Sequence, residues 1–409
     1  MNQLKLKAEW AQSGSTYSDL LPELEEIDTA TEIVRISPGV NGLVLYAKDT
    51  DANDDDVIVA DMIDPLHGTG MDVYEKSELL GTAMKGWDDG IVDAAFKGKL
   101  FMSWPDPQTG NETFAYADPS VLCNINFADI AGEAMARISW PIMNAASYLL
   151  RNTGCKLVVR KADNNGTPVR KVITVRSLQY MDVRQAPLIK LTQRICKDGE
   201  LTGWYVSQDL TEVHYTFPNL SVEREINGEQ LTVIPMIRFA TSDSGKSSMI
   251  WKLGWIVTGG SYRRQIFLSP GKLEFLARHK GEWNQRKETM VENGVTKLFE
   301  KTSDLVDRLD ELEKEQIYYG EAPIVVANLM EDNKEFKRLV KKEVRDAIVA
   351  EAENVFTDPV HTAAEIVMFL SGTADRITGL IPSTVFSIRQ ACGEFFYLKI
   401  RKDVGLKGV

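Results

Sequence analysis

The sequence predicts an α+β protein with a central antiparallel β-meander at about 155–280, preceded by a long helix and followed by a helical C-terminal region. Short turn-forming segments such as Asp163-Asn164-Asn165-Gly166 separate alternating apolar runs in the middle of the chain, and such short connections join antiparallel neighbours. Before and after this region, apolar residues recur three or four positions apart, as in amphipathic helices. Because strands and helices are grouped rather than alternating, the α+β class is favoured over a doubly wound sheet.

The chain of 409 residues is long enough for two or three domains. We divide it into an acidic α/β region at 1–125, a helix with a basic antiparallel sheet at 126–283, and a helical region at 284–409. No apolar run reaches the roughly 18 residues of a membrane span, and the first residues do not form a signal peptide. We therefore expect a cytoplasmic protein without a membrane partner.

In the first region, residues 1–30 are expected to form a short helix or a loosely held arm. Segments 32–36 and 42–47 are expected to pair as a hairpin across Pro38-Gly39. Residues 49–61 partly match a calcium-binding loop but have Asp54 where glycine is needed and Ala60 where glutamate is needed, so an acidic turn before a strand at 57–60 is favoured. Helical spacing then covers 75–84 and 127–152, where Pro141 must kink or split the helix.

The meander and the last third follow from the same two periodicities. The expected strands are 156–161, 168–176, 188–196, 201–206, 222–226, 231–240, 249–257 and 261–268, which we expect in one twisted sheet. The expected helices of the last third are 303–318, 331–356, 361–370 and 385–398.

The charge distribution is the main functional clue in the sequence. The net charge of −12 is an average of −17 over residues 1–135, +10 over residues 136–290 and −5 over residues 291–409. A basic sheet could hold a phosphate backbone, and interleaved aromatic residues could stack on unpaired bases. The residues predicted to bind nucleic acid are Arg160, Lys161, Arg170, Lys171, Arg176, Lys252, Trp255, Tyr262, Arg263 and Arg264. The alternative is that these charges are neutralised by the acidic region or by a neighbouring subunit.

No catalytic residues and no cofactor are predicted. The sequence lacks GxSxG, HExxH and GxGxxG motifs, and its four cysteines and four histidines are scattered, which predicts reduced, mostly buried thiols and no metal site. Gly245, Lys246 and Ser247 fit the looser form of a phosphate-binding loop. Residues 324–330, which precede two acidic residues, are a candidate for the second strand of such a site. Such a loop requires a helix directly after Ser247, where the sequence indicates a strand, so a polar hairpin turn is favoured.

Several short segments in the second half of the chain resemble a family of phage- and plasmid-borne proteins of unknown function. They are Ile234-Pro235-Met236-Ile237-Arg238-Phe239, Ser242-Asp243-Ser244-Gly245, Ser247-Ser248, Arg278-His279-Lys280-Gly281, Ser383-Thr384-Val385-Phe386 and Gln390-Ala391. The resemblance implies a phage or mobile-element origin and no established catalytic residues. In outline, a helix, a basic meander and further helices are also similar to phage single-strand annealing proteins, which form oligomeric rings with DNA in a positively charged groove.

Three functional hypotheses follow. The first is a non-enzymatic, oligomeric phage-type protein that binds single-stranded nucleic acid through the basic sheet, as in annealing or recombination, in the cytoplasm of a bacterial host. The second is a virion or assembly component whose acidic and basic surfaces meet in adjacent copies. The third is a nucleotide-binding enzyme that uses Gly245, Lys246 and Ser247.

Overall fold

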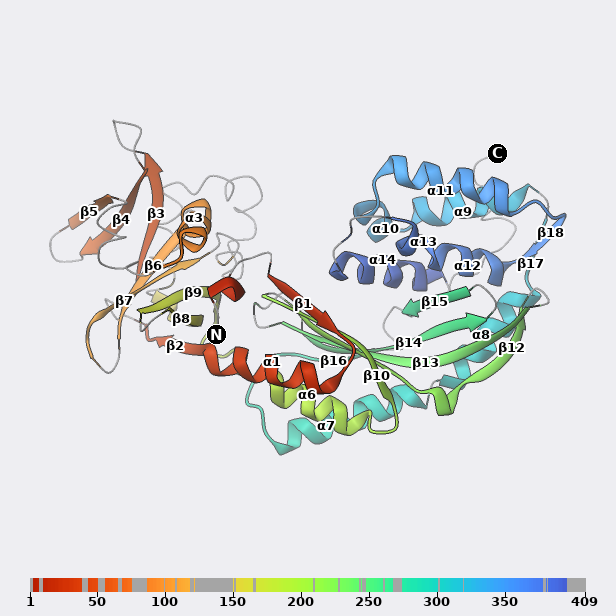
Figure 1. Cartoon of the computed structure of the whole chain (residues 1–409), viewed down its shortest axis with the longest axis horizontal. Helices are drawn as coiled ribbons and strands as arrows, with labels where there is room; N and C mark the ends of the chain where they lie inside the picture. Colours follow the sequence, from red (N-terminus) through yellow and green to blue (C-terminus); the bar gives the residue numbers. More distant parts are fainter. Residues whose placement is uncertain are drawn as a thin grey trace.

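The computed structural model has two lobes, each built on an eight-stranded sheet (Figure 1). The structure describes residues 3–6, 10–38, 43–50, 56–64, 68–75, 87–98, 100–106, 109–117, 121, 150, 152–164, 167–208, 210–226, 229–242, 244, 248–259, 262–267, 274–300, 302–318, 320–377, 380 and 382–395. The long helix predicted at 127–152 and the helix predicted at 75–84 lie almost entirely outside these residues.

Sheet A is fully antiparallel and forms the larger lobe. Its strand order is β1 (Ala11–Gly14), β10 (Glu200–Ser207), β11 (Thr211–Thr216), β13 (Glu229–Thr241), β14 (Met249–Gly259) and β15 (Tyr262–Phe267); β12 (Val222–Ile226) pairs with β13, and β16 (Glu274–Ala277) with β14. Because side chains alternate along each strand, the register gives the two faces different characters. One face carries Val213, Ile237, Phe239, Trp251 and Trp255, all fully buried.

Helices cover both faces of sheet A. The apolar face packs on α1 (Tyr17–Ala30), α6 (Gln185–Ile195) and α7 (Gln285–Phe299), and the indole of Trp251 reaches the hydroxyl of Thr192 on α6 at 3.3 Å. The C-terminal helices lie across the opposite face (Figure 1). They are α9 (Glu321–Asp332), α10 (Lys334–Leu339), α11 (Lys342–Val355), α12 (Ala363–Ser371), α13 (Thr373–Arg376) and α14 (Pro382–Glu394). Helix α8 (Thr302–Lys314) lies at the end of the sheet beside β12, and β17 (Gln316–Tyr318) and β18 (Val360–Thr362) pair between α8 and the later helices (Figure 1).

Sheet B forms the smaller lobe. Its order is β2 (Thr31–Ile36), β8 (Cys155–Asn164), β9 (Thr167–Arg176), β7 (Glu112–Ala117), β6 (Leu100–Pro105), β3 (Val44–Thr50), β4 (Asp56–Asp64) and β5 (Gly68–Glu75). All neighbours are antiparallel except β7 and β9, which are parallel. The short helix α3 (Asp89–Gly98) and the 3-10 helix η1 (Gln3–Leu6) contribute to a small core on one face, and a second core lies on the other face.

The α+β class is confirmed, but the prediction of one sheet over 155–280 is wrong. The hairpin of β8 and β9 forms as predicted, yet it joins sheet B with the N-terminal strands, while β10 to β16 form sheet A. The predicted hairpin of 32–36 with 42–47 is also wrong, because β2 pairs with β8 and β3 pairs with β4 and β6. Turn residues identify hairpins locally, but they do not say which sheet a hairpin joins.

The strand predicted at 188–196 is instead helix α6. Its buried residues, including Leu188, Ile189 and Thr192, recur at helical spacing. The N-terminus of the helix is capped by a carboxylate from another element. The backbone N–H groups of Gln185 and Ala186 donate to Asp28 of α1 at 3.0 and 2.8 Å. This cap comes from a residue more than 150 positions away, so the local sequence gives no sign of it.

The C-terminal region is helical as predicted, although the helix expected at 331–356 is three helices. Asn333 ends α9 and caps α10, because its side-chain oxygen accepts the N–H of Phe336 at 2.8 Å. Thr362 and Glu365 form a reciprocal capping box at the start of α12. Among the described helices, none is long and apolar enough to span a membrane.

We predict that Phe239→Ala destabilises the sheet A lobe by about 3–5 kcal/mol, because a fully buried ring that packs 4.6 Å from the Trp251 ring is replaced by a cavity. Urea unfolding followed by tryptophan fluorescence measures this loss. Leu220→Ala is the control, since Leu220 is 49% exposed and its truncation should change the unfolding free energy by less than about 0.5 kcal/mol. Equal losses in the two variants would contradict the assignment of the core.

Candidate functional site

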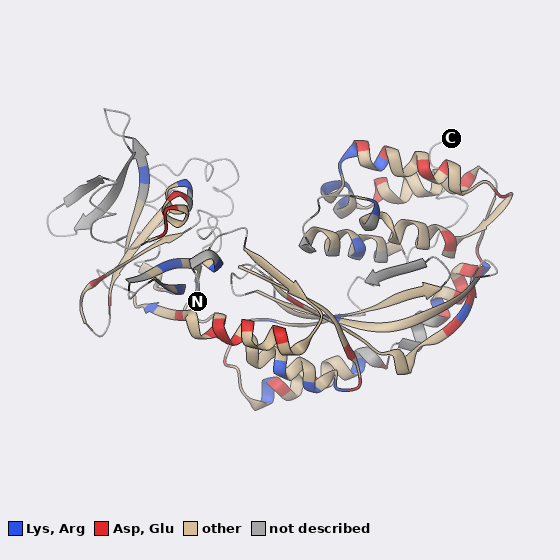
Figure 2. Ribbon diagram, viewed as in Figure 1, with Lys and Arg blue, Asp and Glu red and all other residues tan. Residues whose placement is uncertain are grey.

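The residues predicted to bind nucleic acid do not form one surface. Arg160, Lys161, Arg170, Lys171 and Arg176 lie on the β8–β9 hairpin of sheet B, whereas Lys252 and Trp255 lie on β14 of sheet A. Figure 2 shows Lys and Arg residues spread over both lobes rather than gathered along one sheet. The predicted basic strip therefore does not exist in this form among the described residues.

Burial removes five of these residues from solvent. Trp255 is fully buried in the apolar core, and Arg160, Lys171, Arg176 and Lys252 are between 1% and 7% exposed. The amine of Lys171 donates to the carbonyl of Leu6 at 3.1 Å and to Gln208 Oε1 at 2.7 Å, and it lies over the ring of Tyr116. Lys171 thus holds η1 and the β10–β11 turn against sheet B, which is a structural role.

The outward-facing members of the hairpin offer little more. Lys161 is ion-paired with Glu32 of the neighbouring strand β2, and Arg170 is half-buried. Tyr262, Arg263 and Arg264 occupy β15, whose backbone pairs with β14, but their side chains lie outside the described part of the chain. The side chains of Arg160, Lys171, Arg176, Lys252 and Trp255 are buried within the chain, so they do not line an exposed basic strip along one sheet.

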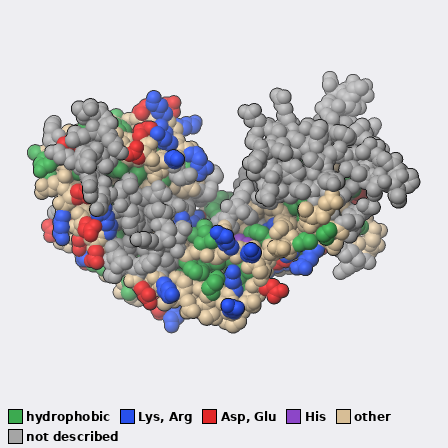
Figure 3. All heavy atoms as spheres, turned by 180° about the vertical axis from the view of Figure 1, so that it is seen from behind, with side chains coloured by type: hydrophobic (Ala, Val, Ile, Leu, Met, Phe, Trp, Pro, Cys, Tyr) green, Lys and Arg blue, Asp and Glu red, His purple; other side chains and the backbone are tan. Residues whose placement is uncertain are grey.

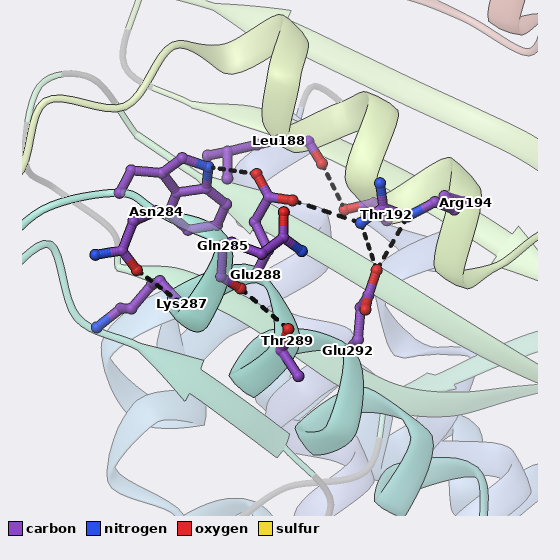
Figure 4. Close-up of polar contacts among 10 residues, drawn as sticks. Leu188, Thr192, Arg194, Asn284, Gln285, Lys287, Glu288, Thr289 and Glu292 are labelled. Atoms are coloured by element: carbon purple, nitrogen blue, oxygen red, sulfur yellow. Dashed lines mark hydrogen bonds and ion pairs between the residues drawn. The ribbon is translucent and has the colours of Figure 1, made fainter.

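Basic residues on the helices are neutralised in a similar way. Arg194 of α6 contacts Glu288 at 3.6 Å and pairs with Glu292, both on α7, as Figure 4 shows. The indole N–H of Trp283 donates to the same Glu288 at 3.1 Å. Carboxylates of the same chain therefore neutralise these basic groups.

The described elements around the predicted nucleotide-binding loop are not those of a phosphate-binding fold. Gly245, Lys246 and Ser247 themselves lie outside the described residues, but the segment that follows is strand β14, which pairs antiparallel with β13. A phosphate-binding loop needs a helix at that position and a parallel sheet. The proposed partner segment 324–330 belongs to helix α9. The alternative of a polar hairpin turn fits the pairing of β13 with β14.

The prediction of reduced, buried cysteines holds for the three that are described. Cys155, Cys196 and Cys392 are free and buried. Burial raises the pKa of the Cys155 and Cys196 thiols to about 12, so both remain protonated at neutral pH and are poor nucleophiles. The described residues contain no group of three His, Cys, Asp or Glu side chains that could hold a metal ion.

The first face of sheet A is apolar, whereas a row of mostly charged side chains crosses the second face. The register places Gly203, His214, Arg238 and Lys252 opposite one another on β10, β11, β13 and β14. Glu212 precedes His214 by two positions and therefore lies on the same face. This row follows directly from the alternation Thr211-Glu212-Val213-His214-Tyr215, in which the apolar members point to the core.

Within this row, Glu212 binds two partners at once. Its Oε1 lies 2.5 Å from His214 Nε2 and its Oε2 lies 2.5 Å from Arg238 Nη2. Burial by itself would raise the pKa of Glu212, but Arg238 and His214 outweigh burial and lower it to about 2. The carboxylate is therefore ionised at neutral pH, and the imidazole nitrogen that faces it must be a donor.

Arg238 is the main partner of this carboxylate. Burial lowers the pKa of Arg238 although Glu212 opposes the shift, yet a guanidinium beside a carboxylate stays charged at neutral pH. Both side chains are almost fully removed from water, at 6% and 7% exposure. Because removing one member would leave a buried charge alone, the two residues depend on each other.

The row ends at a pocket of about 280 Å³ between sheet A and α14. Glu212 and His214 form part of its wall, and Arg389 and Val385 of α14 lie on the other side. The remaining lining residues are Ser13, Gly14, Gly203, Trp204, Tyr205 and Leu380. Gly203 contributes to the hollow, because a methyl group there would meet nothing closer than His214 Nδ1 at 3.9 Å. A partly apolar pocket with a few converging polar groups is the usual form of a ligand site.

Glu212 and His214 were not predicted as site residues from the sequence, and Arg238 entered only as part of a resemblance. Two signals were present. An ionisable pair at positions i and i+2 of a strand shares one face, and a lone arginine within the apolar run of β13 needs a buried partner. The sequence could not show that the two strands are neighbours or that a C-terminal helix closes the pocket.

Comparisons with known proteins do not assign the chain to a family. No protein-family model, no curated protein and no solved structure matches the chain. The resemblance to phage- and plasmid-borne proteins stays a prediction.

Glu212 should make the stability of the protein sensitive to acid. A carboxyl group whose pKa is lowered by folding stabilises the fold above its ordinary pKa of 4.5, and this contribution is lost as the pH falls towards 2. Glu212→Gln should be less stable than the natural protein at pH 7, and we expect the difference in unfolding free energy to shrink by roughly 3 kcal/mol between pH 4.5 and 2.

Urea unfolding at a series of pH values measures this difference. Glu353→Gln, exposed on α11, controls for the loss of one carboxyl group. A difference between Glu212→Gln and the natural protein that stays constant from pH 7 to pH 2.5 would contradict an ionised, ion-paired Glu212.

Proposed function

We propose that the protein binds a small molecule with an anionic group in the pocket between sheet A and α14. The observation that carries the proposal is a buried carboxylate shared by an imidazole and a guanidinium at the wall of that pocket. Burying such charges usually lowers stability relative to apolar residues of the same volume, and perturbed titratable groups of this kind concentrate at functional sites. The volume of about 280 Å³ is near the lower end of the range for small-molecule sites.

The charges around the pocket favour an anion. Arg389 and His214 line the pocket together with Glu212, whose negative charge is balanced by its ion pair with Arg238. His214 is 18% exposed, so its ring can meet a ligand, whereas Glu212 behind it is 7% exposed. We therefore expect His214 to contact the ligand and Glu212 with Arg238 to hold the imidazole in place.

A second His–Glu pair in the chain has a different setting. His361 Nδ1 lies 2.7 Å from Glu365, but that glutamate also accepts the N–H of Thr362 and caps α12. The helix cap explains this pair without a ligand. It therefore provides a matched control for substitutions at His214.

Binding of single-stranded nucleic acid, oligomer formation and a role in virion assembly remain predictions of the sequence. Since five of the residues predicted for the nucleic-acid strip are buried, the pocket is the better supported site for a ligand.

The test is a thermal-unfolding screen with acetate, benzoate, inorganic phosphate and adenosine 5′-monophosphate at pH 6 and pH 8. We expect at least one of these anions to raise Tm in the natural protein, and His214→Gln to weaken its binding about tenfold, as expected for the loss of a hydrogen bond to a charged group. His361→Gln should bind normally. If no anion stabilises the natural protein, or if His214→Gln binds as well as His361→Gln, the proposal fails.

A further inference from the structure

A second cationic site lies where the two lobes meet, away from the pocket. The segment after β9 runs beside the segment after β16: Tyr180 and Lys280 form an antiparallel bridge, and the N–H of Met181 donates to the carbonyl of His279 at 3.2 Å. This seam joins the last strand of the β8–β9 hairpin in sheet B to an edge strand of sheet A. We call the residues around it, Arg35, Lys156, Arg176, Tyr180, Asp182 and 278–280, the seam cluster.

Arg176 is the unusual member of the seam cluster. Its side chain is 93% buried, and its Nε and Nη2 donate no hydrogen bond to any described residue. The guanidinium instead lies 4.3 Å from the centre of the Tyr180 ring, which in turn stacks on His279 at 5.0 Å and 14°. A cation–π contact contributes about 0.5–2 kcal/mol, which is less than the several kcal/mol that burying an unpaired charge costs. An anion at the guanidinium would offset that cost.

The surrounding charges are mostly positive. Arg176 lies opposite Lys156 in the β8–β9 register, and Lys156 lies opposite Arg35 in the β2–β8 register. Asp182 is the carboxylate that meets this row, at 2.7 Å from the Lys156 amine and 3.6 Å from Arg35. It is already engaged with these two residues and does not contact Arg176 within ion-pair distance.

Two exposed cations extend the seam cluster to the surface. Arg278 and Lys280 follow β16, and neither makes an ion pair with a described residue; the exposed Glu282 lies two positions beyond Lys280. Figure 3, which views the molecule from behind, shows Lys and Arg side chains next to apolar ones near the middle of the molecule. Five cations therefore stand against Asp182 and Glu282.

We infer that the seam cluster binds a phosphate group. Arg176 has two N–H groups in the fork arrangement that fits two phosphate oxygens, and Lys280 adds a mobile positive charge at the surface. The Tyr180 ring is engaged both by the Arg176 guanidinium and by the stacked His279 ring, which holds the guanidinium in place. The phosphate could belong to a free nucleotide or to single-stranded nucleic acid, and Arg176 is the residue that this site shares with the strip predicted from sequence.

The experiment measures binding of the whole protein to inorganic phosphate, thymidine 5′-monophosphate and a dT12 oligonucleotide at two salt concentrations. We expect Kd for the tightest of these ligands to rise about tenfold in Arg176→Gln and several-fold in Lys280→Ala, because each loses a charge-assisted contact. Lys280 is exposed, so Lys280→Ala keeps the test informative even if Arg176→Gln does not fold. Lys334→Ala, exposed on α10, is the control and should bind normally.

The three ligands identify the source of the phosphate. Tight, salt-sensitive binding of dT12 supports a polynucleotide, and equal binding of thymidine 5′-monophosphate supports a nucleotide. The inference is overturned if none of the three ligands binds, or if Lys280→Ala and a folded Arg176→Gln both bind like Lys334→Ala. His214→Gln should leave binding at the seam unchanged, which separates this inference from the pocket.

Discussion

The ion pair between Glu212 and Arg238 sets the chemistry of the second face of sheet A. One face of the sheet packs its large apolar residues against α1, α6 and α7, and the other face carries this pair under the C-terminal helices. A buried carboxylate and guanidinium are compatible with the fold only while they remain together. The carboxylate of Glu212 also fixes Nε2 of His214 as a donor. The other ring nitrogen, Nδ1, lies on the side of Gly203 and the pocket wall.

Basic residues in the middle third of the chain are likewise buried, and most have a structural role inside the protein. Lys156, Arg160, Lys171 and Arg176 sit on the inward-facing positions of the β8–β9 hairpin, and the hydrogen bonds of Lys156 and Lys171 tie loops and strands together. A local excess of Lys and Arg in a sequence can therefore hold a structure together from inside. Arg176 differs from Lys156 and Lys171 because its Nε and Nη2 find no acceptor among the described residues, and for that reason it carries the inference at the seam.

Much of the fold could be predicted from the sequence, because turn residues and periodicity act locally. The β8–β9 hairpin, most strands of sheet A and the helical C-terminal third follow from these signals. What could not be predicted depends on distant partners: α6 starts on Asp28 of α1, and the β8–β9 hairpin joins sheet B through β2 and β7. The pocket was missed for the same reason, since Glu212, Arg238 and Arg389 come from three separate elements.

A double-mutant cycle on Glu212 and Arg238 tests this account most directly. The unfolding free energies of Glu212→Gln, Arg238→Met and the double variant are compared with that of the natural protein at pH 7. If the pair is mutually dependent, each single change costs about 3–5 kcal/mol, and the double change costs at least about 2 kcal/mol less than their sum. Losses that add to within about 0.5 kcal/mol would show that the two charges are independent and would remove the basis for the site.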